Sequence, residues 1–355
     1  ALCALLFGCA TYRPQSLASA DIERTLRSPE RAALVRDAAM FSHPRLPPVT
    51  LDFSHALTPE QVAVIAVLVN PDLQALRAQA RVAAAQVFAA GLLPDPQLAA
   101  GFDKTLSPPG LFTALSGALT LDVGALATRG AERAVALAAE RQVRLDLLWQ
   151  EWLVAGQARS LAHRVQHLGR LVVLAEEARA LAERNLTRAL RAAERRDLRA
   201  DELQARRIAA TDAIDRALAA QRDFAAAKLD LNRLLGLAPN ETLDVTVGET
   251  QLRVPADPER LFEAARTERL DLEALRAGFE SQNAAVRRAV LGQFPRFSLT
   301  LTRARDTSKV ETFGPSVTFD LPLWNRNRGA IRVAEAGRQR LHAEYAARLH
   351  ATRAD

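Results

Sequence analysis

The chain has 355 residues, enough for two ordinary domains or one large elongated one. Its 47 Lys and Arg and 41 Asp and Glu residues give a net charge of +6, and the two signs are mixed along the chain. This mixture is typical of solvated helix faces and argues against a nucleic-acid-binding protein. No run of about 18 apolar residues occurs, so the sequence predicts no transmembrane helix.

The first ten residues, "ALCALLFGCA", are typical of the end of a secretory signal peptide. The residues before Cys9 resemble the lipobox of bacterial lipoproteins, whose Cys receives diacylglycerol and palmitate. We therefore expect residues 1–9 to be a signal-peptide remnant with Cys9 as the lipid-attachment residue, and Ala10 in place of Asp favours the outer membrane. An ordinary secretory signal with incidental cysteines is the alternative. Because the chain lacks an initial Met and stops inside a helical pattern, we expect it to be incomplete at both ends.

Residues 10–57 contain Pro, Ser and His without sustained periodicity. They predict a periplasmic tether with one short helix near residues 21–37. Thr58 is an N-cap type of residue and Pro59 follows it, so a helix is predicted to begin there. Apolar residues then recur at helical spacing as far as Gly91, where this helix is predicted to end.

The segment 125–236 predicts two long antiparallel helices, because no proline interrupts it and apolar residues from Leu161 to Val172 follow a coiled-coil seam. The chain is predicted to reverse within residues 188–202, where the apolar spacing lapses. We expect about 50 residues, or about 75 Å, in each helix. Gly236 is predicted to end the second helix.

The sequence contains an internal repeat. "DLQALRA" at residues 72–78 matches "DLEALRA" at residues 271–277, an offset of 271 − 72 = 199 residues. Pro96 matches Pro295 at the same offset. The motif "RGA" also occurs twice at this offset, first at Arg129. Matches in the same order along the chain indicate two copies of one structural unit.

The repeat defines the predicted organisation. The first unit, 58–250, contains a helix, a β-hairpin at 96–123 and the long helical hairpin 125–236. The second unit, 251–355, contains a helix, a β-hairpin at 295–323 and the start of a long helix, and stops before a return helix.

Both predicted hairpins alternate apolar with small polar residues, as do transmembrane barrel strands of about 9–11 residues. A half-buried sheet in a soluble domain is the alternative. Four strands are too few to close a barrel, so a membrane barrel would need several copies of the chain, and a trimer would supply twelve strands. The residues expected to line the lumen are Thr120, Ser298, Thr300, Thr302, Ser316 and Thr318. The aromatic residues expected at the lipid interface are Phe297, Phe319 and Trp324.

Three segments carry a more specific pattern: "NPDLQALRAQARVAAAQVFAAGLLPDPQLAAGF", "AKLDLNRLLGLAP" and "VTFDLPLWNRNRGAIRVAEA". They resemble the repeat opening, the return-helix ending and the strand-to-helix exit of the TolC family of outer-membrane efflux channels, in particular its lipid-anchored members. The resemblance covers residues 55–355. It implies a mainly α fold with membrane β, in which a trimeric 12-stranded β-barrel continues into a periplasmic α-helical barrel. It also implies docking to an inner-membrane pump through a periplasmic adaptor, a membrane fusion protein.

The tip of the helical hairpin departs from the family pattern. The family commonly has a Gly before a polar turn, where this chain has Arg195 and Arg196. The residues expected to face the adaptor are Arg195, Arg196, Asp197 and Leu198, with a plain solvated turn as the alternative. The family's periplasmic gate draws on the second helical hairpin, most of which this sequence lacks, so no gate residue is predicted.

The sequence predicts no catalytic residue, metal site or cofactor. It has no Gly-rich phosphate loop, Ser-His-Asp pattern or conspicuous carboxylate pair. His163 and His167 share a helix face, but they lack a third ligand, and we interpret them as solvated. Asp122 and Asp320 precede the two long helices at equivalent positions, where capping and conductance are alternative roles.

We therefore expect a passive duct for small molecules or ions, the outer-membrane component of a tripartite efflux or export system driven by an inner-membrane pump. The expected protein is a homotrimer anchored by lipid in the outer membrane of a Gram-negative bacterium and extending into the periplasm. One alternative is a lipid-anchored periplasmic coiled-coil scaffold without a pore. Another is a cytoplasmic coiled-coil protein that binds nucleic acid. The sequence identifies neither the transported substrate nor the classes of pump and adaptor.

Overall fold

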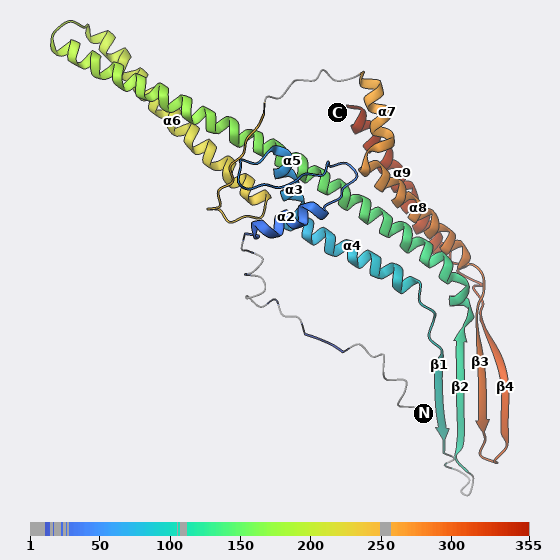
Figure 1. Cartoon of the computed structure of the whole chain (residues 1–355). Coiled ribbons are helices and arrows are strands. Elements are labelled where there is room, and N and C mark those ends of the chain that lie inside the picture. Colours follow the sequence, from blue (N-terminus) through green and yellow to red (C-terminus); the bar gives the residue numbers. More distant parts are fainter. Residues whose placement is uncertain are drawn as a thin grey trace. The chain divides into compact units, whose positions relative to one another are not determined.

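The computed structural model describes residues 28–104, 112–248 and 257–354, together with residues 11–14, 17, 23, 26 and 106 (Figure 1). Helix α2, Arg31–Met40, precedes the first repeat. The first repeat contains α3 (Pro59–Val69), α4 (Pro71–Ala90), β1 (Gln97–Asp103), β2 (Ala114–Asp122), α5 (Val123–Glu194) and α6 (Ala200–Leu234). The second repeat contains α7 (Pro258–Glu268), α8 (Leu270–Leu291), β3 (Arg296–Arg305), β4 (Glu311–Asp320) and α9 (Arg328–Ala354). The predicted order of helix, hairpin and long helix is confirmed in both repeats.

The described residues form two compact units that cut across the repeats. One unit comprises those of Ala1–Leu73 and Glu151–Gln251, and the other comprises those of Gln74–Gln150 and Leu252–Asp355. The first unit contains α2, α3, α6 and the C-terminal part of α5. The second contains the four strands, α7, α8, α9, most of α4 and the N-terminal part of α5. Helix α5 thus contributes residues to both units.

In the first unit, helix α2 begins at Arg31 and ends at Met40, and so overlaps the C-terminal part of the helix predicted near residues 21–37. Glu23, within the N-terminal part of that prediction, is also helical. Most of residues 18–27 lie outside the described part. The Arg31 guanidinium lies over the Phe53 ring, 5.4 Å from its centroid. Contacts with later segments of the chain therefore help to position α2, and they are not visible in the local sequence pattern.

Helices α3 and α4 correct the prediction of one helix from Thr58 to Gly91. Its start is confirmed, because Thr58 and Gln61 form a capping box in which each side chain accepts the other residue's backbone N–H. The helix is interrupted at Asn70, which has φ −54° and ψ 125°. A residue before proline favours such an extended conformation, and Pro71 then begins the next helix.

The two long helices have unequal lengths, 72 residues in α5 and 35 in α6, so the prediction of two equal helices was wrong. Helix α5 is longer because it begins directly after β2, where Asp122 Oδ1 accepts the Ala125 N–H at 2.8 Å and caps the helix. The predicted reversal is confirmed, since the turn lies between Glu194 and Ala200. Gly236 follows α6 with φ +60°, which confirms the predicted stop.

In the second unit, the four strands form one antiparallel sheet in the order β1-β2-β3-β4 (Figure 1). The strands β1 and β2, and likewise β3 and β4, form the two predicted hairpins. The central pair β2–β3 joins the hairpins into one sheet, although long helices separate them in the sequence. Opposite residues include Thr120 with Thr300 and Ser298 with Thr318.

The helices of the second unit pack through small and aliphatic residues. Helix α8 lies beside α9. Its buried Leu270, Ala274 and Ala277 pack against Leu145 of α5, with Trp149 at the edge of this cluster. Arg269 separates α7 from α8 in an extended conformation, as Asn70 separates α3 from α4. Within the described residues, no helix combines the length and the apolar character needed to cross a membrane.

Candidate functional site

One face of the sheet carries the six residues predicted to line a lumen. They lie together because directly paired residues of antiparallel strands share a face. We call this the polar face: Thr120, Ser298, Thr300, Thr302, Ser316 and Thr318. The hydroxyl oxygens of Thr120 and Thr300 are 2.8 Å apart and form a hydrogen bond between β2 and β3. Gln97 pairs with Thr120 and extends this face onto β1, where Ala99 and Gly101 continue it.

The opposite face of the sheet is apolar and exposed. We call it the apolar face, and its residues are Leu98, Phe102, Leu115, Leu119, Leu121, Phe297, Leu299, Leu301, Phe313, Val317 and Phe319. Ten of these eleven are exposed large hydrophobic residues, from 39% at Phe297 to 80% at Leu98. A continuous apolar surface of this kind is unfavourable in water and typical of a surface that another apolar phase or partner covers.

Two of the three aromatic residues predicted at a lipid interface lie together. The rings of Phe297 and Phe319 face each other across β3 and β4, with their centroids 6.0 Å apart. Trp324 lies outside the sheet, in the link between β4 and α9, and is 91% exposed. The structure therefore places the phenylalanines on the apolar face and leaves Trp324 apart from them.

The strands β1 and β4 are the two edges of the sheet. Each pairs with a neighbour on one side only, as far as the described residues show. Strand β1 has 7 residues and β4 has 10. An unpaired strand edge presents backbone N–H and C=O groups that can pair with a further strand.

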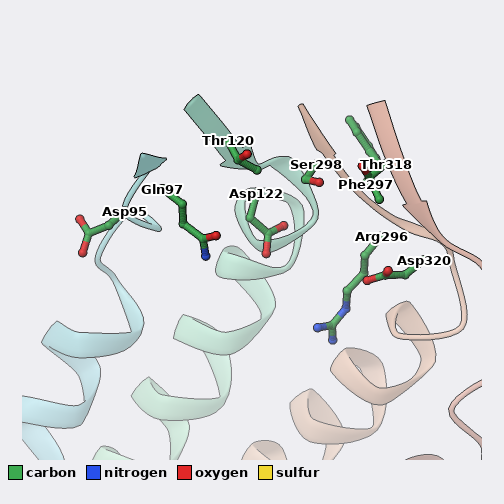
Figure 2. Close-up of a pocket in the computed structure, with 9 residues that line it drawn as sticks. All are labelled: Asp95, Gln97, Thr120, Asp122, Arg296, Phe297, Ser298, Thr318 and Asp320. Atoms are coloured by element: carbon green, nitrogen blue, oxygen red, sulfur yellow. The ribbon is translucent and has the colours of Figure 1, made fainter. Parts of the chain in front are cut away.

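A polar pocket of about 250 Å³ lies where the strands meet the helices (Figure 2). Asp95, Asp122 and Asp320 line it together with Arg296, the one basic residue of its lining. The start of α5 and the start of β3 come close together beside this pocket. A Cβ added at Gly124 would lie 3.0 Å from the Arg296 Cβ. Asp122 caps α5, so its capping role is established, whereas β4 ends at Asp320 and α9 begins only at Arg328.

The sequence interpretation missed part of this pocket. It did not single out Asp95, Gln97 or Arg296 as site residues. Each of them lies next to one of the two repeated prolines, Pro96 and Pro295, at the start of a strand. The sequence signal that could have identified this pocket was therefore a polar residue beside a proline at the start of a strand.

The predicted adaptor-facing residues lie at the turn between α5 and α6. Arg196 has φ 67°, and its N–H donates to the Ala193 carbonyl at 3.0 Å, while the Asp197 N–H donates to the Ala192 carbonyl at 2.9 Å. This pattern ends α5 as a Schellman motif, in which the left-handed position is normally a glycine. Arg196 therefore occupies the glycine position of the turn. Arg195, Arg196 and Asp197 are exposed, and Leu198 is half-buried.

Two carboxylates away from the sheet have shifted pKa values. Hydrogen bonds from the Ser54 side chain and N–H lower the pKa of Asp52 to about 2. Burial, and secondarily the Asp271 carboxylate, raise the pKa of Asp146, which the Arg348 guanidinium partly counteracts. His163 is half-buried and His167 exposed. Within residues 28–104, 112–248 and 257–354, no group of three His, Cys, Asp or Glu side chains is placed to hold a metal ion.

Several solved structures have this fold. A crystal structure of CusC has a TM-score of 0.68 and 17% sequence identity, covering 87% of this chain and 79% of that one. The outer membrane protein VceC of Vibrio cholerae has a TM-score of 0.63 and 17% identity over 82% of this chain and 75% of that one. The CmeC outer membrane channel of Campylobacter jejuni has a TM-score of 0.68 and 15% identity over 82% of this chain and 68% of that one. No curated protein matches the sequence.

The sequence profile of the outer membrane efflux proteins matches residues 261–355. This C-terminal segment of the chain is thus similar in sequence to outer membrane efflux proteins. The matched segment begins within α7 and includes α8, both strands of the second hairpin and α9. The resemblance inferred from the sequence is confirmed, and so is the expected combination of a mostly helical fold with a small β part.

Proposed function

We propose that this protein is the outer-membrane duct of a tripartite efflux system. The observation that carries the proposal is the sheet, with a polar face of small hydroxyl residues on one side and an exposed apolar face on the other. A sheet of this kind suits a wall between lipid and water, since lipid-facing and lumen-facing residues alternate along such strands. The polar face then lines the lumen, and Phe297 and Phe319 lie at a lipid interface.

The duct is a homotrimer. The free edges of β1 and β4 support this, because an open edge in lipid leaves backbone groups without hydrogen bonds. Three copies, each pairing its β1 with the β4 of a neighbour, would supply twelve strands and close the sheet. The pocket around Arg296 then lies at the helix-side end of the lumen, where three carboxylates from each copy meet the passing solution.

The duct is passive and performs no catalytic step. Transport is driven by an inner-membrane pump, which connects through a periplasmic adaptor. The exposed turn with Arg195, Arg196, Asp197 and half-buried Leu198 is the surface that contacts the adaptor. The exposure of this turn and the strained backbone of Arg196 support that role, because conformational strain often accompanies a functional position.

Lipid at Cys9 anchors the protein in the outer membrane of a Gram-negative bacterium, and the long helices extend into the periplasm. Cys9 lies outside the residues that the structure describes, so this part of the proposal rests on the sequence. Palmitate labelling of the full-length precursor, lost in Cys9→Ala, is the expected result. Absence of labelling in the unaltered precursor would disprove lipidation and leave the duct proposal intact.

Conductance in planar bilayers tests the duct, with two adjacent residues on opposite faces as a matched pair. We expect full-length trimers to conduct. Thr300→Arg adds a cation to the polar face and should leave insertion intact while shifting selectivity toward anions. Leu299→Arg places a cation on the apolar face and should prevent stable insertion, because a lipid-facing arginine is unfavourable within the membrane. A folded trimer that does not conduct would instead support a scaffold without a pore.

A further inference from the structure

The apolar face changes character from one end of β3 to the other. Near the helices it begins with Phe297, followed by Leu299 and Leu301. Near the β3–β4 turn the same face continues with Arg303 and Arg305. The two arginines alternate in register with the preceding leucines, so they lie on the apolar face and not on the polar one.

The surroundings of the two arginines leave them accessible. Arg303 is paired across the strands with Gly117, where an added Cβ would meet no atom within 4 Å, so there is open space beside it. Its Nη2 donates to Glu311 Oε2 at 3.1 Å. Arg305 has neither a side-chain hydrogen bond nor an ion pair with any residue in the described part of the chain. Arg303 is exposed and Arg305 half-buried, and Lys104, just beyond the end of β1, adds another exposed cation.

The spacing along β3 approaches the thickness of the apolar part of a membrane. From Phe297 to Arg305 the strand rises about 27 Å along its own axis, which is about 20 Å across the membrane at the tilt of about 40° typical of such strands, against an apolar band of about 25 Å. An arginine that faces lipid is costly at the membrane midplane and nearly neutral at the surface. If the two phenylalanines lie at one surface, the long side chains of Arg303 and Arg305 therefore reach the headgroups at the other.

The charge balance at this end favours an anionic partner. At this end Lys104, Arg303, Arg305 and Lys309 contribute four positive charges, against three negative charges from Asp103, Asp306 and Glu311, which leaves a net charge of +1. Guanidinium groups bind phosphate through paired hydrogen bonds. We propose that Arg303 and Arg305, with Lys104, form a binding site for the phosphate groups of a membrane lipid at the turn-side surface of the bilayer. This inference rests on the proposed insertion of the sheet in a membrane.

The test uses full-length trimers in nanodiscs of phosphatidylcholine, with and without lipid A as a phosphorylated lipid. Native mass spectrometry measures the lipid retained. Unaltered protein should prefer lipid A, and Arg303→Gln/Arg305→Gln should weaken that preference roughly tenfold. Arg206→Gln/Arg207→Gln removes the same charge from exposed positions on α6 and should have no effect. Glu311→Gln should strengthen retention, because it frees Arg303 from its ion pair.

Equal lipid A retention in the unaltered protein and in the β3 double variant would overturn the proposal. Displacement of lipid A by millimolar inorganic phosphate would overturn the assignment to a lipid and identify a general anion site. Conductance of the same samples separates this inference from the duct. Conducting trimers without lipid preference would refute the lipid site alone, whereas trimers that neither insert nor conduct would refute the duct on which it rests.

Discussion

The two repeats contain the same elements but hold them in place with different side chains. Each repeat interrupts its helix at the same position, at Asn70 and at Arg269, and 269 − 70 = 199 residues separate them. Asn70 Oδ1 accepts the Leu73 N–H at 3.0 Å, and Asn70 Nδ2 donates to the Leu234 carbonyl at 2.8 Å. Arg269 instead donates two hydrogen bonds to the Asp271 carboxylate, at 3.1 and 3.0 Å. The backbone break is thus shared, while its stabilising chemistry differs.

The connections from the second strand of each hairpin to the long helix also differ between the repeats. Strand β2 leads directly into α5, and Arg129 Nε donates to the Gly91 carbonyl at 2.9 Å. Strand β4 is followed by residues 321–327, which include a proline, before α9 begins. There Asn327 Nδ2 donates to the Ala289 carbonyl at 2.7 Å. In both repeats a residue near the start of the long helix donates a hydrogen bond to a carbonyl at the C-terminal end of the helix that precedes the hairpin.

The largest expected effect is at Asp271, which is 5% exposed and also lies 3.5 Å from Arg348. Asp271→Ala should lower the free energy of unfolding by about 3 kcal/mol, because it leaves Arg269 without its buried carboxylate. Asp72→Ala alters the matching position of the first repeat, where the side chain is exposed, and should change the free energy by less than about 0.5 kcal/mol. Urea unfolding in detergent measures both. Equal losses of stability in the two variants would refute the claim that different side chains stabilise the helix interruptions at Asn70 and Arg269.

The next effect is at Asn70. Asn70→Ala removes both the helix cap and the bond to the Leu234 carbonyl, and should destabilise the protein by about 2 kcal/mol. Asn70→Ser keeps a neutral acceptor for the Leu73 N–H and removes the amide donor, so about half of that loss is expected. Comparing the two variants in the same unfolding assay separates the contribution of the acceptor from that of the donor. A loss in Asn70→Ser as large as that in Asn70→Ala would assign the whole effect to the amide donor.

The sheet could be predicted from the sequence because its pattern is local. Alternation of apolar and polar residues placed the hairpins at 96–123 and 295–323, and the strands lie within those limits. The same alternation assigned six hydroxyl residues to one face, and the register places them there. The pairing of β2 with β3 could not be predicted in this way, since it joins segments on either side of two long helices.

The helix breaks could not be predicted because apolar spacing continues through both of them. The first break has Pro71 as a local cause, but the second lies at Arg269, and no proline follows it. There the Arg269 guanidinium lies 5.1 Å from the centroid of the Trp149 ring on α5, a contact that only the tertiary structure reveals. The polar residues beside Pro96 and Pro295 marked part of the pocket at Arg296, but their meeting in one site depends on the pairing of the two hairpins.

A smaller effect is expected where the ends of the two long helices differ. Gly236 occupies the left-handed position after α6, and Arg196 occupies the corresponding position after α5. Arg196→Gly should therefore stabilise the protein by about 1 kcal/mol, since a side chain is unfavourable at positive φ. Arg191→Gly, one turn earlier and still helical, should destabilise it by about 1 kcal/mol. If both variants destabilise, the Arg196 side chain contributes contacts that outweigh its backbone strain.

The smallest effect concerns Asp146, which takes the position that Tyr345 has in the second repeat, since 345 − 146 = 199. The Tyr345 hydroxyl accepts a hydrogen bond from Arg276 at 3.0 Å, whereas Asp146 brings a carboxylate near Asp271. Because burial and Asp271 raise the pKa of Asp146 above its ordinary value of 3.8, the folded protein holds this proton more tightly than the unfolded chain does. The contribution of Asp146 to stability is therefore lost as the pH rises from about 3.8 through the raised pKa.

Asp146→Asn removes this charge and should raise the melting temperature at pH 7, with a gain of less than about 1 kcal/mol because the group is partly solvated. The gain should disappear below pH 3.8, where the carboxyl is protonated in both states. Asp212→Asn, at an exposed position on α6, should give no gain at either pH. A gain from Asp146→Asn that is the same at acidic and neutral pH would show that packing, and not the charge, distinguishes Asp146 from Tyr345.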